Sequence, residues 1–401
     1  MTQTSERDTP PIEPDLHGIE RRARDRFGSY LKDLEALVNI ECGTYLAEGV
    51  NQVADLMEER FRSSGWSTER VAHAPAEDEP RLGDAIVARL PGSAAGKRRV
   101  LLLGHMDTVF PDGTARERPF RKEGSTAFGP GVSDMKGGLL AGYYAVACLQ
   151  DLGFEGFDSI TYVCNPDEEI GSPFSGPLIL ERARNADVCF VLEGARENGD
   201  IVSARKGVAG LLIEVNGRAA HAGVEPERGR SAILQAAHAV TALHALNGRW
   251  PGVTVNVGVV QGGTRANVVA ERCELDVDIR ATTAETFAEV LQEVERVART
   301  LVVPDTRVEV TTRAGFSPME KTEATARLVE RAKAIARELG FEVQDAATGG
   351  ASDANPVSGL GVPTLDGLGP IGGADHAPGE WLDLDSVVPR IALLAGLIAT
   401  A

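Results

Sequence analysis

The chain has few cysteines for its 401 residues, and their placement excludes a cysteine-based site. Five are present at wide spacings, and none forms a CxxC pair. Neither a disulfide framework nor a cysteine zinc site is therefore indicated. Three of them, Cys148, Cys164 and Cys189, lie in apolar segments, where we expect them to be small core residues.

Long apolar runs and an excess of positive charge are also missing. No segment approaches the roughly 18 apolar residues of a membrane helix, and residues 1–18 lack the apolar centre of a secretory signal. We therefore expect no membrane association, a disordered lead over residues 1–16 and a cytoplasmic location, the alternative being a mature chain already freed of a signal. The net charge of −18 would repel a phosphate backbone, so a nucleic-acid partner is not expected.

The first half of the chain has strands that alternate with helices. A chain of 401 residues is too long for one ordinary core and suits two domains, or one large domain that carries an insertion. The alternation predicts an α/β fold with a mostly parallel sheet that helices cover on both faces. The expected strands are 84–90, 99–103, 159–164 and 188–192, and the expected helices are 18–41, 48–65, 136–152 and 177–186.

The middle of the chain changes to the order β-α-β-β-α-β, which is typical of a ferredoxin-like α+β unit. Its expected elements are strands 208–215, 254–260, 271–280 and 307–312 and helices 230–246 and 284–301. The first pattern then resumes with helix 322–339, strand 363–368 and helix 385–400. We therefore expect a split α/β domain, residues 1–206 and 316–401, with an inserted domain at 207–315.

Histidines and acids follow several of the expected strands. His105 and Asp107 are two residues apart at a strand end, so they point the same way, as a metal ligand and the acid that orients it would. The alternative is a surface histidine beside a turn. Asp134 lies in a Gly-rich turn at a helix start, where it is either an N-cap or a carboxylate that bridges two cations.

Further acids and a second histidine complete the set. Asp167, Glu168 and Glu169 are adjacent carboxylates, which repel one another unless a cation is near; a solvated acidic turn is the alternative. Glu193 ends an apolar strand, where open α/β sheets bind ligands. His376 lies in a Gly-rich loop near the C-terminus.

Together these residues predict a centre for two metal ions. Each ion would have one histidine, one terminal acid and an oxygen of the shared Asp134. Nitrogen and oxygen ligands suit zinc, with manganese or cobalt as alternatives. Two metals about 3.5–4 Å apart can hold a hydroxide at neutral pH and polarise a carbonyl. One of Glu168 and Glu169 would remain as general base.

Five ordered motifs carry a family resemblance. They are GHMDTV, GPGVSDMKGG, DEEIGS, LEG and GGADHAPGEW. Over roughly residues 30–400 the chain resembles the co-catalytic zinc peptidases that include glutamate carboxypeptidase, aminoacylase, acetylornithine deacetylase and succinyl-diaminopimelate desuccinylase. The resemblance implies a zinc exopeptidase fold in which the inserted domain is a lid that mediates dimerisation.

The resemblance also implies a role for each residue of the centre. His105 and His376 would each bind one zinc, and Asp107 would orient His105. The carboxylate of Asp134 would bridge the two zinc ions, and a cis peptide bond between Asp134 and Met135 would aim it. The terminal acids would be Glu169 and Glu193, and the general base Glu168.

Three residues of the inserted domain also match the family. His221 in GRAAHAG resembles the residue that reaches a neighbouring active site in a homodimer and stabilises the oxyanion. Asn267 in GGTRANVV resembles a contact to the substrate's carboxylate or backbone, and Arg280 in DVDIR the residue that grips its free carboxylate. The alternatives are a loop histidine and a strand-end surface cation.

Three features favour the glutamate carboxypeptidase branch: Glu193 and the segments LVNIECGT and TGGASDA. Members of that branch carry one further arginine beside a proline after the last strand of the inserted domain, and here only Arg313 lies near that place. We expect a two-zinc hydrolase that cleaves the amide bond of a C-terminal or N-acyl amino acid, a small molecule with a free carboxylate. The alternatives are an amidohydrolase for another N-acyl amino acid or a xenobiotic or aryl amide, an aminopeptidase, which Arg280 disfavours, and a non-catalytic metal-dependent binding protein, which Glu168 disfavours.

Overall fold

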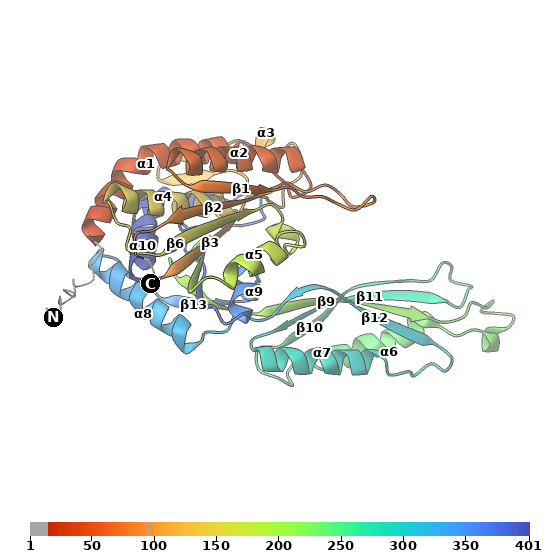
Figure 1. Ribbon diagram of the computed structural model, residues 1–401. Coiled ribbons are helices and arrows are strands. Elements are labelled where there is room, and N and C mark those ends of the chain that lie inside the picture. The colour runs from red at the N-terminus through yellow and green to blue at the C-terminus, as the bar shows by residue number, and fades with distance from the viewer. Residues whose placement is uncertain (1–14, 95–96) are drawn as a thin grey trace, which may run out of the picture. The chain divides into compact units, whose positions relative to one another are not determined.

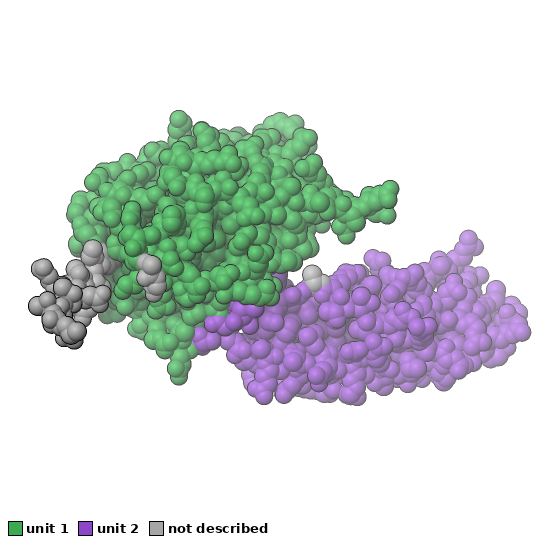
Figure 2. Space-filling view, in the orientation of Figure 1, with its two compact units in different colours: residues 1–201, 323–345, 362–401 green, residues 202–322, 346–361 purple. Residues whose placement is uncertain are grey.

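The computed structural model describes residues 15–94 and 97–401. The chain divides into two compact units, coloured separately in Figure 2. Unit 1 comprises residues 1–201, 323–345 and 362–401, and unit 2 comprises residues 202–322 and 346–361. Apart from Asp15 and Leu16, the expected disordered lead lies outside the described residues.

Unit 1 is built on a sheet with the strand order β1-β2-β6-β3-β7-β14. Strands β6, β3, β7 and β14 run parallel, and β1 and β2 join them antiparallel at one edge, which confirms the expected mostly parallel sheet. Strand β1 was not predicted, because its sequence STERV has no apolar alternation. The bounds are β1 (Ser67–Val71), β2 (Ala85–Pro91), β3 (Arg99–His105), β6 (Ser159–Asn165), β7 (Val188–Val191) and β14 (Thr364–Leu365).

Helices cover both faces of this sheet, with α1 and α2 on one side and α5 on the other (Figure 1). Helices α1, α4 and α10 pack against one another, and α4 is buried over most of its circumference, as its apolar sequence requires. The helices are α1 (Leu16–Val38), α2 (Ala47–Ser63), α3 (Thr114–Glu117), α4 (Gly137–Asp151), α5 (Gly176–Ala183), α8 (Glu323–Glu338) and α10 (Val387–Thr400).

A second, smaller sheet of unit 1 has the order β15-β16-β5-β4. None of its strands was predicted, because two- and three-residue strands are too short to show periodicity. The loop between β15 and β16 carries His376, one of the predicted ligands. The bounds are β4 (Arg121–Glu123), β5 (Thr126–Phe128), β15 (Gly372–Gly373) and β16 (Trp381–Asp383).

Unit 2 contains the expected β-α-β-β-α-β order, with an antiparallel sheet in the order β10-β11-β9-β12. Alternate residues of β9 and β11 are buried, and they pack against α6 and α7 in one apolar core. The bounds are β9 (Gly207–Asn216), α6 (Ala232–His244), β10 (Thr254–Gly262), β11 (Arg272–Ala281), α7 (Ala284–Ala298) and β12 (Arg307–Phe316).

The division differs from the expected domain boundaries in three segments. Residues 202–206, 316–322 and 346–361, expected to lie in the split α/β domain, group with unit 2, and the last segment is the largest of the three. The side chain of Asn355, in α9 (Ala354–Gly359), donates hydrogen bonds to the carbonyls of Lys206 and Ser317, which ties the segment there. The sequence could not show this, because these contacts join residues far apart in the chain. At the start of this segment, β13 (Asp345–Thr348) pairs with β8 (Ile201–Arg205) in a two-stranded sheet.

Two of the expected absences can be examined in the structure. All five cysteines are buried as free thiols, including the three expected in the core. Over residues 15–94 and 97–401, no helix is at once long and apolar enough to pass through a membrane.

Candidate metal centre

The ends of three parallel strands bring the predicted ligands to one edge of the sheet. His105 is the last residue of β3, and Glu193 follows β7 by two residues. The short 3₁₀ turn Glu168–Ile170 follows β6. Because β3 pairs in parallel with both β6 and β7, these residues meet at the carboxyl edge, where sheets of this kind bind ligands.

Asp134 lies between the two histidines. Its Oδ1 is 3.0 Å from Nε2 of His105, and its Oδ2 is 3.0 Å from Nε2 of His376. The peptide bond between Asp134 and Met135 is cis. One carboxylate thus offers a different oxygen to each imidazole, which is the arrangement of a bridging ligand.

Each histidine also has a terminal acid. Glu193 Oε1 is 3.8 Å from Nε2 of His105, and Glu169 Oε2 is 3.2 Å from Nε2 of His376. The donor atoms form two groups, each with all atoms within 4.8 Å of one another and with Asp134 in both. The structure therefore brings together the five residues that the sequence predicted as metal ligands.

The electrostatics of the centre call for positive charge. Hydrogen bonds to Asp134 and Glu169 raise the pKa of His376 to about 10. Burial works to lower the pKa of His105, but hydrogen bonds to Asp107 and Asp134 outweigh it and raise that pKa well above its usual value. The carboxylates thus favour positive charge at the two imidazoles, which is where metal cations would bind. Two imidazole nitrogens and three carboxylates without thiolate fit a pair of zinc ions.

Asp107 is fully buried behind His105. The imidazole Nδ1 lies 2.9 Å from the backbone oxygen of Asp107 and 3.4 Å from its Oδ1, so the residue fixes the ring mainly through its main chain. The carboxylate accepts the hydroxyl of Thr44 at 2.6 Å and the backbone N–H groups of Glu168 and Glu169 at 3.2 and 3.3 Å.

Glu168 and Glu169 are adjacent but differ in position. Glu169 lies beside His376 and Asp134, whereas Glu168 belongs to neither ligand group found among the described residues. Glu168 is half-buried and follows the buried Asp167, whose carboxylate accepts the backbone N–H groups of Phe174 and Ser175. Glu168 is therefore the neighbour in sequence of a ligand candidate without being one itself.

A family comparison now agrees with the geometry. The model of peptidase family M20/M25/M40 matches residues 101–400. The chain belongs to this family. Carboxypeptidase G2 of a Pseudomonas species is 31% identical over 379 residues, which cover 94% of this chain and 90% of that protein. Acetylornithine deacetylase of Myxococcus xanthus is 28% identical over 86% of this chain and 90% of its own length. The resemblance drawn from the motifs is therefore confirmed, and the chain is a hydrolase of a metal-dependent family.

Solved structures support the fold of this family M20/M25/M40 chain. An aminopeptidase from Bacillus cereus aligns with a TM-score of 0.75 at 21% identity, over 93% of this chain and 98% of that one. A family M20 metallo-carboxypeptidase from Sulfolobus solfataricus aligns at 0.71 and 16% identity, over 92% and 98%. The predicted zinc exopeptidase fold is thus confirmed.

The predicted residues of the inserted domain lie in unit 2, at two separate places. His221 and Asn267 are exposed and adjacent, since the backbone N–H of Ala222 donates to the Asn267 carbonyl at 3.0 Å. Arg280 lies near the end of β11, where its guanidinium contacts Asp278 at 3.0 Å and donates to the Gly349 carbonyl at 2.6 Å.

Two residues near the metal centre were not predicted. Thr44 donates to Asp107, and the buried Glu380 accepts backbone N–H groups of the turn that carries Asp134. Both lie inside segments that carry the family resemblance, LVNIECGT and GGADHAPGEW, so the motifs could have marked them as candidate site residues. Their hydrogen-bond partners could not be read from the sequence, because these partners lie far away in the chain.

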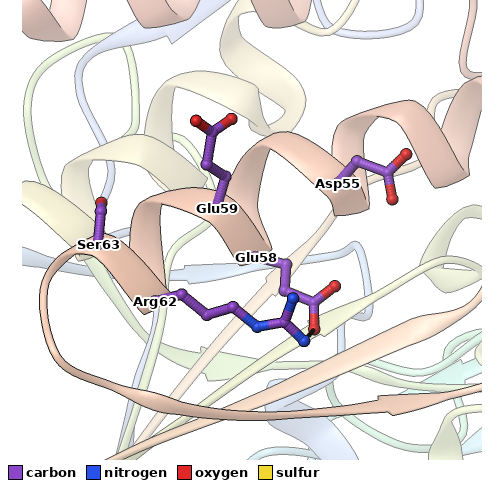
Figure 3. A pocket seen from close by; sticks show the side chains of 5 residues that line it. All are labelled: Asp55, Glu58, Glu59, Arg62 and Ser63. Atoms are coloured by element: carbon purple, nitrogen blue, oxygen red, sulfur yellow. Dashed lines mark hydrogen bonds and ion pairs between the residues drawn. The ribbon is translucent and has the colours of Figure 1, made fainter.

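One surface pocket of unit 1 lies apart from this chemistry. Figure 3 shows its lining, which comes from α2 alone: Asp55, Glu58, Glu59, Arg62 and Ser63. None of the metal-ligand candidates lines it. We therefore assign it no part in the site.

Proposed function

We propose that this hydrolase uses two zinc ions to cleave the amide bond beside a C-terminal amino acid that has a free carboxylate, as a glutamate carboxypeptidase does. The observation that carries the proposal is the bridging position of Asp134 between His105 and His376, 3.0 Å from each. The 31% identity to carboxypeptidase G2 supports this branch of the family.

The reaction requires a base beside the metal centre. When bound, zinc ions, or manganese or cobalt in their place, would make the attacking water more acidic and would polarise the carbonyl. His105, Glu193, His376, Glu169 and the shared Asp134 would hold them. Glu168 accepts a proton from the attacking water and returns it to the leaving nitrogen. Its backbone N–H is held by Asp107, so the base keeps a fixed place relative to His105.

Arg280 is proposed to bind the free carboxylate of the substrate, and Asn267 to contact its carboxylate or backbone. Arg280 is half-buried and already oriented by Asp278, which lowers the entropy lost when it binds a ligand. Arg313 also forms an ion pair with an aspartate, at 2.6 Å from Asp276, but it is exposed whereas Arg280 is half-buried. We therefore propose that Arg280 is the arginine that binds the α-carboxylate.

A homodimer is proposed because His221 and Arg280 are far apart within unit 2. His221 is bridged to Val268, before β11 starts at Arg272, whereas Arg280 is near the end of that strand. At about 3.3 Å per residue, Arg272 and Arg280 alone are roughly 26 Å apart. A single small amide cannot reach both residues of one copy. We therefore assign His221 to the partner's substrate, where it would stabilise the oxyanion.

The unit 2 surface offers an edge for such a dimer. Within the described residues, β10 pairs only with β11, and Val259 and Val260 on it are 42% and 53% exposed. An open strand edge with exposed apolar side chains is a template for pairing with a second copy. Buried free thiols are also compatible with the proposed cytoplasmic location.

The test combines metal analysis with a substrate panel of aryl-glutamate, acyl-glutamate, acyl-aspartate, acyl-ornithine and dipeptides. Two metals per chain with preferred cleavage of acyl-amino acids that bear a free α-carboxylate are expected. Preferred cleavage of an amide without a free α-carboxylate would favour the alternative amidohydrolase. Two bound metals without turnover of any amide would favour a binding protein and overturn the proposal.

A further inference from the structure

Three backbone N–H groups of the turn that carries Asp134 converge on one buried carboxylate. Glu380 is 2% exposed. Its Oε1 accepts the N–H groups of Ser133 and Asp134 at 2.8 and 3.0 Å, and its Oε2 accepts that of Gly131 at 2.9 Å. The proposed reaction uses Glu380 neither as a ligand nor as a base.

The turn is held from its other side as well. Lys136 is buried, and its Nζ donates to the Pro130 carbonyl at 3.0 Å. Gly131 has a φ of +74°, and a Cβ there would lie 2.6 Å from Cγ2 of Thr108. The carboxylate of Glu380 thus accepts hydrogen bonds from the N–H groups of a tightly packed turn, and the ammonium of Lys136 donates one to a carbonyl of the same turn. Burying Glu380 is costly unless such donors compensate it, so the residue and the turn require each other.

The loop that carries Glu380 also carries His376. It runs from β15 to β16, which pair at Gly373 and Trp381, and it is closed by a hydrogen bond from the Glu380 N–H to the Ala377 carbonyl at 3.2 Å. One loop therefore makes two contacts with one turn: His376 faces the Asp134 side chain, and Glu380 holds the Asp134 main chain.

We propose that Glu380 is a positioning residue that sets the bridging carboxylate of Asp134 against His376, and that binding of the metal at the His376 group depends on it. This inference rests on the proposed two-metal function. All three of its N–H contacts go to the turn, so Glu380 acts through Asp134 and not as a ligand.

The two metals should depend on Glu380 unequally. His105 and Glu193 are placed by the ends of β3 and β7, which do not include the loop. His376 and the orientation of Asp134 both depend on the contact between the loop and the turn. Loss of Glu380 should therefore weaken the metal of the His376 group more than the metal of the His105 group.

The experiment titrates metal-free enzyme with Zn²⁺ by calorimetry, and with Co²⁺ by visible absorption, for the wild type and Glu380→Gln. Glutamine keeps the shape, but its amide N–H₂ meets a backbone N–H donor instead of accepting from it. We expect the second metal to bind 10- to 100-fold more weakly, on the scale of other residues that orient ligands, and the first metal to change less.

The matched control is Glu58→Gln. Glu58 is another buried glutamate of unit 1. Its carboxylate accepts hydrogen bonds from Arg62, its neighbour on α2 (Figure 3), and from Thr68 on β1, neither of which belongs to the turn. The Glu58→Gln variant should bind both metals with wild-type affinity. Wild-type affinities in Glu380→Gln would overturn the inference.

A second variant keeps the inference testable if Glu380→Gln does not fold. Glu380→Asp retains the charge, but its side chain is shorter by one methylene and cannot reach all three N–H groups. The affinity of this variant for the second metal should therefore also fall. Unchanged binding there would overturn the inference too. If the wild-type protein itself bound no metal, the proposed function would fail instead, so the two failures are distinguishable.

Discussion

The carboxylate of Asp107 accepts the backbone N–H of Glu168 at 3.2 Å, so the residue behind one histidine also holds the proposed base. Replacement of Glu168 by glutamine removes the proton acceptor and leaves every metal ligand in place. We expect turnover to fall by about 10²- to 10⁴-fold while two metals stay bound. Steady-state kinetics together with metal analysis checks this, and unchanged turnover would remove Glu168 from the mechanism.

Asp107→Asn tests the other side of this contact. An amide group cannot accept hydrogen bonds at both positions, so at least one of the Thr44, Glu168 and Glu169 donors loses its partner. Metal affinity should fall by about 10- to 100-fold, as for other residues that orient ligands. Thr44→Val, which removes one donor only, should have a smaller effect in the same zinc titration. Equal effects of both variants would show that the carboxylate does not act as a common anchor.

The proposed sharing of residues between subunits is tested by mixing two variants that are each impaired at a substrate concentration below KM. His221→Ala should lower kcat by about 10²- to 10³-fold, since it removes an oxyanion donor, and Arg280→Ala should raise KM. If His221 acts in the partner's site and Arg280 in its own, mixed dimers contain one intact site of two. An equimolar, randomly exchanged mixture should then recover about a quarter of wild-type activity. No recovery in exchanged dimers would place both residues in the same subunit's site.

Part of the metal centre was predictable because strand periodicity placed its residues at one edge of one sheet, whereas Asp134 and His376 were named from their Gly-rich motifs. His105, Glu193 and the acids after β6 follow apolar runs that any parallel sheet would align. Glu380 and the segment 346–361 were not predictable, since their positions depend on contacts between residues far apart in the chain. The short strands β4, β5, β15 and β16 were missed for a related reason: their positions are set by pairing and not by a local pattern.

An ion pair at the opposite edge of the same sheet gives a prediction about stability. Asp187, just before β7, accepts the backbone N–H of Arg99 at 2.8 Å and contacts its guanidinium at 2.8 and 3.1 Å. The hydrogen bond to Arg99 lowers the pKa of Asp187. A carboxyl with a lowered folded pKa stabilises the protein above its unfolded pKa of about 3.9, and this contribution is lost as the pH falls through the folded value.

Asp187→Asn should therefore lower the free energy of unfolding by up to about 1 kcal/mol at neutral pH, the scale of a partly exposed ion pair. The difference from the wild type should shrink as the pH is lowered past about 3.9, because the wild-type carboxyl is then protonated too. Urea unfolding across this range measures it, with Asp112→Asn as control, since Asp112 is 68% exposed and 3.7 Å from Arg116. A difference that stayed constant with pH would assign the effect to the shape of the side chain and not to its charge.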